Sequence, residues 1–275
     1  MGNELSVALL HAAPVALYLT LGGIVWKRLA AGHPLSGPAK RRLFALGVSA
    51  LCLHGWLLYR ALYGDGNLSL GLTSVTSLVA WAVTFIFLVT MLRKPIENLA
   101  VFIMPTAAGG ILLEWWWPSR PVPTPETSAW LFAHVVISIL AYSLLSIAVV
   151  QGLMLAIQEH RLHQKQAGKF LRVLPPMQTM ETLMFQMIAV GFALLTLTLV
   201  SGIFFSEQLF HRPLVMTHHI VLSVFAWGVF AILLLGRWRF GWRGRNAVRW
   251  TLGGFVLLLL AYLGTRFVLE IAFAH

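Results

Sequence analysis

The chain has 275 residues, of which 59% are hydrophobic and only 11% are Asp, Glu, Lys or Arg. A soluble domain of this length needs more polar surface, so the composition excludes a soluble globular protein and indicates an integral membrane protein. The formal net charge is +11, but the basic residues lie between apolar runs and not along one polar face, so we expect no nucleic-acid partner. The single cysteine, Cys52, excludes an intramolecular disulfide and a cysteine-based metal cluster.

Eight apolar runs are long enough, at about 20 residues each, to cross a bilayer as helices. The sequence therefore predicts an all-α polytopic membrane protein with eight transmembrane helices in one bundle, forming a single membrane domain over residues 1–275. The expected spans are residues 5–26, 43–63, 70–92, 96–117, 128–157, 178–205, 214–236 and 250–272. Because Lys27 and Arg28 follow the first run and no basic segment precedes it, we interpret that run as an uncleaved span.

The basic residues are divided unequally between the two sides of this predicted bundle. Of the 20 Lys and Arg residues, 16 follow the first, third, fifth and seventh runs; the other four are Arg60, Arg120, Arg212 and Arg266. The positive-inside rule then places both termini away from the cytoplasm. We expect a multi-pass protein of a bacterial inner (plasma) membrane, surrounded by membrane lipids.

The sixth run is the one around which we expect the other helices to pack. Pro175 and Pro176 cannot continue a helix from upstream, so a new helix is expected to begin after them. Within it, a stripe of mostly small side chains recurs at helical spacing: Gly191, Leu195, Thr198 and Gly202. Such a stripe allows another helix to approach closely. A packing face without chemistry is sufficient to explain it.

Glu114 and the tryptophans that follow it, Trp115, Trp116 and Trp117, end the fourth run. Tryptophan is enriched at membrane interfaces, and an aromatic shelf for a flat cofactor is the alternative interpretation. A carboxylate inside a span is costly unless it has a partner, so Glu114 is a candidate functional residue. In the last run, Arg266 and Glu270 are four residues apart and are expected to pair within one helix.

Six histidines are candidate ligands for a cofactor. His54 is expected near the middle of the second span, and the others are expected in the outer halves of their spans or at the outer end of the chain: His11, His134, His218, His219 and His275. Two imidazoles from different helices can hold a haem iron from opposite faces. Each histidine is also compatible with a buried, hydrogen-bonded packing role. Adjacent His218 and His219 point about 100° apart, so at most one is expected to face a shared site.

Several segments occur in an order that resembles the cytochrome c assembly family of CcsA- and CcmC-like haem-handling membrane proteins. They are His134-Val135 with Ala141-Tyr142, Leu174-Pro175-Pro176, Gly191-Phe192 with Leu195-Thr196 and Gly202, Gly241-Trp242-Arg243-Gly244, and Tyr262-Leu263-Gly264. The family-like core extends over about residues 43–272, and the whole chain most resembles the YpjD-type inner membrane branch.

The resemblance implies haem as the cofactor and assigns roles to particular histidines. His134 matches the first outer-face histidine of the family, His54 matches an in-membrane histidine, and His275 matches the second outer-face histidine with a shifted spacing. Two family features are missing. The Trp-rich loop expected before the seventh span is replaced by Ser206 to Arg212, and the in-membrane histidine before the Gly-Trp-Arg-Gly segment is replaced near Gly236.

From these patterns we expect a haem-associated membrane protein that is an accessory in cytochrome or respiratory complex assembly, with other membrane proteins as partners. His134 and His219 are the predicted ligands of the haem iron, with His218, His11, His275 and His54 as further candidates. No catalytic residues are predicted, and we expect a protein that is not an enzyme. The alternative is a transport-associated or regulatory membrane subunit that retains the fold without haem.

Overall fold

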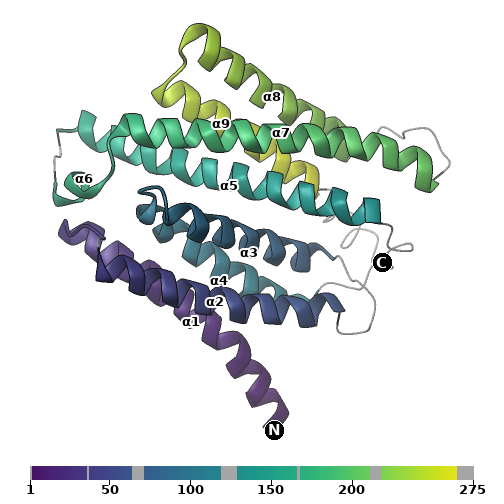
Figure 1. Cartoon of the computed structure of the whole chain (residues 1–275), viewed down its shortest axis with the longest axis horizontal. Coiled ribbons are helices and arrows are strands. Elements are labelled where there is room, and N and C mark those ends of the chain that lie inside the picture. Colours follow the sequence, from purple (N-terminus) through teal and green to yellow (C-terminus); the bar gives the residue numbers. More distant parts are fainter. Residues whose placement is uncertain are drawn as a thin grey trace. The chain divides into compact units, whose positions relative to one another are not determined.

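The computed structural model describes residues 2–35, 37–63, 71–118, 129–165, 168–210 and 218–264. All regular secondary structure within these ranges is helical, which confirms the predicted all-α class. The elements, of which the α-helices are labelled in Figure 1, are α1 (Gly2–Ala31), α2 (Pro38–Tyr63), α3 (Leu72–Met91), η1 (Glu97–Leu99), α4 (Ala100–Trp116), α5 (Ala129–His163), α6 (Lys169–Val173), α7 (Met177–Phe210), α8 (His218–Phe240), α9 (Gly244–Leu259) and η2 (Leu260–Gly264).

Seven helical segments in the described residues are long and apolar enough to cross a membrane. They are Ala8–Ala31, Pro38–Tyr63, Leu72–Met91, Glu97–Trp116, Trp130–His163, Met177–Ile203 and His218–Phe240, and they coincide with the first seven predicted spans. The eighth predicted span, 250–272, is helical as far as Gly264 in α9 and η2. Its remaining residues, with Arg266 and Glu270, lie outside the described residues, so the eighth span stays a prediction.

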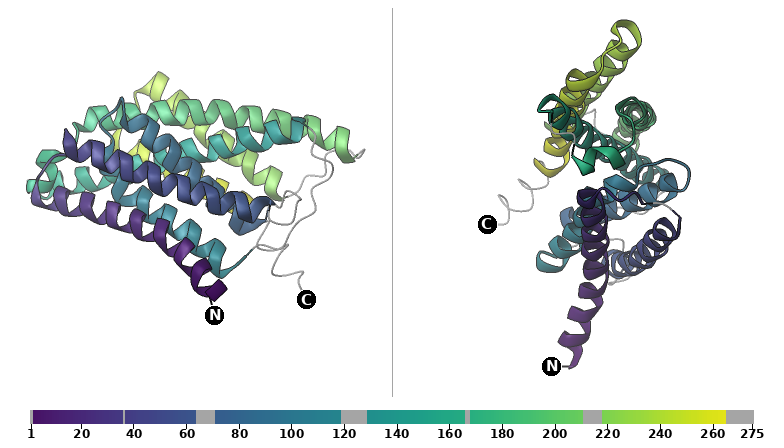
Figure 2. Two further views of the ribbon diagram at one scale, coloured as in Figure 1. Left: turned by 60° about the horizontal axis from the view of Figure 1, so that its bottom comes forward. Right: turned by 90° about the vertical axis from the view of Figure 1, so that its left-hand side faces the viewer.

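The chain divides into two compact units, which we describe separately. The N-terminal unit consists of residues 1–125 and 161–176, and the C-terminal unit consists of residues 126–160 and 177–275. In the N-terminal unit α1 packs against α2 and α4, and α3 also packs against α2 and α4. In the C-terminal unit α8 packs against α7 and α9. Figure 2 shows the helices within each unit running alongside one another. The single membrane domain stays a prediction.

In the N-terminal unit, α1 contributes one face to the core. Tyr18, Leu21, Val25 and Leu29 recur at helical spacing and are all buried. At the C-terminal end of α1, Gly32 has a positive φ of 76°, and a Cβ there would lie 2.7 Å from the Cβ of Lys169.

The basic segments at the ends of the helices of the N-terminal unit lie close to one another. The contacts that hold them there were not evident from the sequence pattern. Lys40 at the start of α2 forms an ion pair with Glu97 in η1. The short helix α6, which was not predicted, brings Phe170 against the ring of Trp26 and places it 4.8 Å beneath the guanidinium of Arg161. The basic loops of this unit therefore lie at one end of its helices.

In the C-terminal unit, α7 begins at Met177, directly after the two prolines, as predicted. A Cβ added to Gly191 would lie 2.9 Å from Cγ and Cδ2 of Leu145 on α5, so the two backbones approach closely there. Leu195 is buried, and the Thr198 hydroxyl lies 3.4 Å from that of Ser138. The small-residue stripe is therefore the face of α7 that packs on α5, which confirms the prediction.

Two helices extend beyond the spans that the sequence predicted. α7 continues to Phe210, so Ser206–Phe210 are helical and not part of the loop after the sixth span. α5 likewise continues past residue 157 to His163. Hydropathy marks where a helix leaves the apolar layer, whereas the helix itself continues until a residue stops it, and the first proline after α7 is Pro213.

Candidate functional site

His134 lies in the second turn of α5, and its ring contacts α7. Its Nδ1 is 2.8 Å from Oγ of Ser201. The Ser201 hydroxyl donates its proton to the carbonyl of Thr198 at 3.1 Å, so towards His134 the serine oxygen accepts and Nδ1 carries the proton. This tautomer leaves the ring's lone pair on Nε2, the nitrogen through which such a histidine binds a metal.

Contacts on the helix backbones fix where this ring sits. The Ser138 hydroxyl donates to the carbonyl of His134 at 2.7 Å. On the facing helix, Gly202 has no side chain, and a Cβ built there would lie 3.6 Å from Cε1 of His134. The half-buried imidazole therefore packs against Gly202, the last residue of the small-residue stripe on α7. Ser201, which precedes Gly202, orients the ring.

His219, in the first turn of α8, lies close enough to His134 for the two rings to interact electrostatically. The two histidines that the sequence predicted as ligands of the haem iron therefore belong to the same unit and interact electrostatically. His218 and His219 are both exposed at the start of α8. His275 lies outside the described residues.

The other two predicted histidines belong to the N-terminal unit. His54 is fully buried, with Nε2 at 3.0 Å from Oγ of Ser77 and Nδ1 at 3.5 Å from the hydroxyl of Tyr18. His11 stacks on Trp115, with ring centroids 5.4 Å apart and planes 15° apart. Both ring nitrogens of His54 thus face protein hydroxyls, the arrangement of the hydrogen-bonded packing role that the sequence left open.

Glu114 has the partners that a carboxyl in a span requires. The hydroxyls of Ser74 and Ser77 hydrogen-bond to it, and His11 interacts with it electrostatically. Its Oε1 is nevertheless buried without a hydrogen-bond partner among the described residues. Glu114 is therefore connected through Ser77 to His54.

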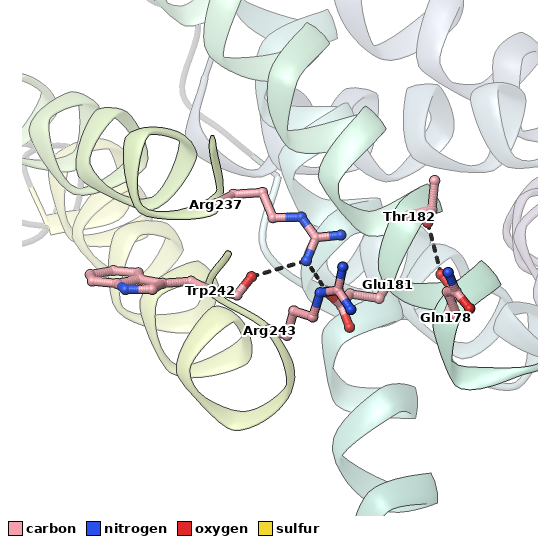
Figure 3. Close-up of polar contacts among 6 residues, drawn as sticks. All are labelled: Gln178, Glu181, Thr182, Arg237, Trp242 and Arg243. Carbon is pink, nitrogen blue, oxygen red and sulfur yellow. Dashed lines mark hydrogen bonds and ion pairs between the residues drawn. The ribbon is translucent and has the colours of Figure 1, made fainter. Parts of the chain in front are cut away.

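A second polar cluster joins α7 to the end of α8, about 30 Å along α7 from Ser201 at 1.5 Å per residue. Nη1 of Arg237 lies 2.5 Å from Oε1 of Glu181 and 3.1 Å from the carbonyl oxygen of Trp242, and Figure 3 shows these contacts as dashed lines. Nε of Arg243 lies 4.0 Å from the same Glu181 oxygen. Glu181 therefore connects the segment after the two prolines with the Gly-Trp-Arg-Gly segment.

The same turn explains the missing in-membrane histidine near Gly236. A Cβ at Gly236 would lie 2.5 Å from Cδ2 and 2.6 Å from Cε3 of Trp242, far inside contact distance. The indole occupies the space that a side chain at this position would need. A histidine could not occupy position 236 unless Trp242 moved.

Sequence reasoning missed the residues that position the histidines. Ser201 and Ser77 are hydroxyl-bearing residues within apolar helices, and Tyr18 is an aromatic residue within one, so spacing gives no sign of their roles. Ser201 is next to Gly202 in the predicted packing stripe, which was the available signal. Glu181 could have been recognised as a carboxylate one turn after the start of α7 facing an arginine-rich loop.

The histidines of the C-terminal unit have side chains that can act as ligands of a haem iron. No group of three His, Cys, Asp or Glu side chains that could hold a metal converges in the part of the chain that the structure describes. A haem supplies four ring nitrogens itself and needs only axial ligands from the protein, for which two histidines suffice.

Seven membrane-length helices, an apolar composition and a histidine pair at one end of the C-terminal unit define a polytopic helical membrane protein. The model of the family described as "Cytochrome C assembly protein" matches residues 43–273. The chain belongs to this cytochrome c assembly protein family.

Individual relatives agree with that assignment. The inner membrane protein YpjD of Escherichia coli K12 is 30% identical over 264 residues, which cover 95% of this chain and 96% of the relative. Protein HemX of Brevibacillus brevis is 25% identical over 54% of each chain. The cytochrome c biogenesis protein CcsA of Gloeobacter violaceus is 28% identical over 38% of this chain and 31% of its own length.

Proposed function

We propose that this protein binds haem at the end of the C-terminal unit where α5, α7 and α8 place His134 and His219. The observation that carries the proposal is the hydrogen bond between Nδ1 of His134 and Ser201, which orients the imidazole, together with the electrostatic interaction between His134 and His219. Haem would supply an iron centre with two axial positions for these rings. Ser201 and Gly202 orient and seat the His134 ring, and Ser138 anchors its backbone.

The names of the relatives support a role in cytochrome or respiratory complex assembly. CcsA is named for cytochrome c biogenesis, and the family is named for cytochrome c assembly. The connection from α7 to α8 is confined to residues 211–217, which contain no tryptophan. The Trp-rich loop implied by the resemblance therefore has no counterpart, and we propose an accessory that retains or senses haem, with membrane proteins as partners. This is a binding role and not an enzymatic one.

We further propose eight spans in a bacterial inner membrane, with both termini on the outer side. The support is the gathering of the basic loops at one end of the N-terminal unit, the arginines around Glu181 in the C-terminal unit, and the relative named as an inner membrane protein. Reporter fusions after residues 38, 165 and 243 should report the cytoplasm, and fusions after 66, 122 and 275 the opposite side. A cytoplasmic signal at residue 275 would eliminate the eight-span topology.

The test of haem binding is the visible spectrum of the full-length protein, purified after expression with ample haem. We expect a Soret band whose position and reduced-state bands correspond to two imidazole ligands. His134→Ala and His219→Ala should each reduce or shift this band, while His218→Ala, a neighbouring exposed histidine, serves as the matched control. Wild-type protein without a Soret band would refute the proposal.

In that event the second candidate, a transport-associated or regulatory subunit that retains the fold without haem, takes its place. One observation favours it independently of the haem site. The N-terminal unit contains a half-buried carboxyl, with its Oε1 buried, and a fully buried histidine connected to it through a serine, an arrangement characteristic of membrane proteins that handle protons or ions.

A further inference from the structure

A continuous series of polar side chains runs through the middle of the N-terminal unit. We name it the polar chain and define it as Glu114 on α4, Ser77 on α3, His54 on α2 and Tyr18 on α1. Ser77 hydrogen-bonds to the Glu114 carboxyl and lies 3.0 Å from Nε2 of His54. Nδ1 of His54 lies 3.5 Å from the Tyr18 hydroxyl. Each helix of the four contributes one member.

Burial makes this arrangement informative. Ser77, His54 and Tyr18 are all completely buried, and apolar side chains of the same size would pack there without any polar group to satisfy. Each member of the polar chain can both donate and accept a hydrogen bond, which is the property that proton transfer along a series of groups requires. Packing alone does not require that every member be able both to donate and to accept a hydrogen bond.

We infer that the polar chain is a proton relay that connects the Glu114 end of the N-terminal unit with the buried His54. Its entrance is the cluster of His11, Ser74 and Glu114, where the buried Oε1 of Glu114 has no hydrogen-bond partner among the described residues. Under the predicted topology this end faces outward. The relay therefore takes up its proton from the outer side of the membrane.

The transfer balances without any further reactant. The protonated Glu114 carboxyl passes its proton to the Ser77 oxygen as the Ser77 hydroxyl proton passes to Nε2 of His54. The resulting imidazolium carries a proton on each nitrogen. Its Nδ1 proton is directed at the Tyr18 oxygen, so the positive charge on the ring is held by a hydrogen bond and Glu114 is left as the carboxylate.

Beyond Tyr18 the relay ends inside the protein. The Tyr18 hydroxyl is hydrogen-bonded to Thr84, whose own hydroxyl donates to the carbonyl of Ala80 at 2.9 Å. The next buried side chains towards the basic end are apolar, among them Val25, Phe87 and Met91. The polar chain therefore loads a proton from one side and does not conduct it across the membrane.

Few other titratable groups face His54. Helix α3 contains no titratable side chain between Leu72 and Met91. On α1 the facing group is Tyr18, with His11 nearer the entrance, and on α4 it is Glu114. Cys52, on the same helix as His54, interacts electrostatically with Tyr18. Any pH response of His54 should therefore depend mainly on Glu114.

The experiment is an infrared pH titration of the full-length protein in lipid nanodiscs. A protonated carboxyl has a carbonyl stretching band that a carboxylate lacks, and Glu114→Gln identifies the band that belongs to Glu114. In His54→Gln we expect the titration midpoint of this band to shift by about one pH unit, because coupled groups change each other's protonation. In a Ser77→Ala background, His54→Gln should no longer shift it.

Two further variants control for folding and for indirect effects. Ser143→Ala removes an equally buried serine hydroxyl in the C-terminal unit and should leave the midpoint unchanged. Tyr18→Phe keeps the ring packing and should shift the midpoint less than His54→Gln does. The inference is overturned if no band is lost in Glu114→Gln, if His54→Gln leaves the midpoint in place, or if its effect persists without the Ser77 hydroxyl. None of these measurements requires haem.

Discussion

Each unit ties a histidine to a serine on another helix, and the two pairs differ in what surrounds them. His54 lies 3.0 Å from Ser77 in a fully buried position with Tyr18 at its other nitrogen. His134 lies 2.8 Å from Ser201 near a helix end, with a second imidazole close by. In the roles that we propose, the same kind of hydrogen bond supports a proton-transferring group in the N-terminal unit and a metal ligand in the C-terminal unit. Burial and the partner of the second nitrogen decide between these roles.

The largest expected effect separates the two histidines directly. His134→Ala should abolish most of the Soret absorbance, because an axial ligand of the iron is removed. His54→Gln should leave the band in place, since that histidine lies in the other unit with hydroxyls at both ring nitrogens. Visible spectra of the two variants at equal protein concentration provide the measurement. Equal loss of haem in both would mean that the two histidines serve one site.

The second prediction compares glycines in the two units. Gly191→Leu should lower the free energy of unfolding by about 1–3 kcal/mol, because Leu145 already lies where its Cβ would be. At Gly109 on α4 nothing lies within 4 Å of an added Cβ, so Gly109→Leu should not destabilise the protein. Thermal unfolding of the purified variants tests both. A stable Gly191→Leu variant would show that α5 and α7 are not closely packed.

The third prediction concerns the serines. Ser201→Ala should weaken haem binding roughly tenfold, because second-sphere hydrogen bonds orient metal-binding histidines. Ser77→Ala removes the corresponding hydroxyl in the N-terminal unit and should leave haem affinity unchanged. Haem titration of apoprotein measures both. Unaltered affinity in Ser201→Ala would mean that the serine does not position the His134 ring.

The smallest effects are expected at the ion pairs. Glu181→Gln should reduce the free energy of unfolding by about 1 kcal/mol, since Glu181 holds Arg237, which also bonds the Trp242 carbonyl and stacks on Phe185. Glu97→Gln, which removes the partner of Lys40 in the N-terminal unit, should reduce it by about 0.5 kcal/mol. Chemical unfolding in detergent can rank the two. A larger loss of stability in Glu97→Gln than in Glu181→Gln would mean that the Lys40–Glu97 ion pair is the more stabilising of the two.

The sequence by itself determined the features that depend on neighbouring residues along the chain. The apolar runs predicted the seven membrane-length helices, because a span needs only length and hydropathy. Pro175 and Pro176 predicted the start of α7, and the spacing of Gly191 and Gly202 predicted its packing face. The choice of His134 and His219 as the ligand pair stays a prediction, to which the structure adds an electrostatic interaction between the two residues.

Only the tertiary structure decided which polar groups meet. Ser201 is 67 residues from His134, Ser77 is 23 residues from His54, and Tyr18 is 36 residues from His54, so no local pattern relates them. The filling of the Gly236 position by Trp242 depends on a turn with its own geometry, not on hydropathy. In an apolar helix a serine or a glycine has the same sequence pattern whether it faces lipid, a neighbouring helix or a histidine. The contact that gives it a role exists only once the helices are packed.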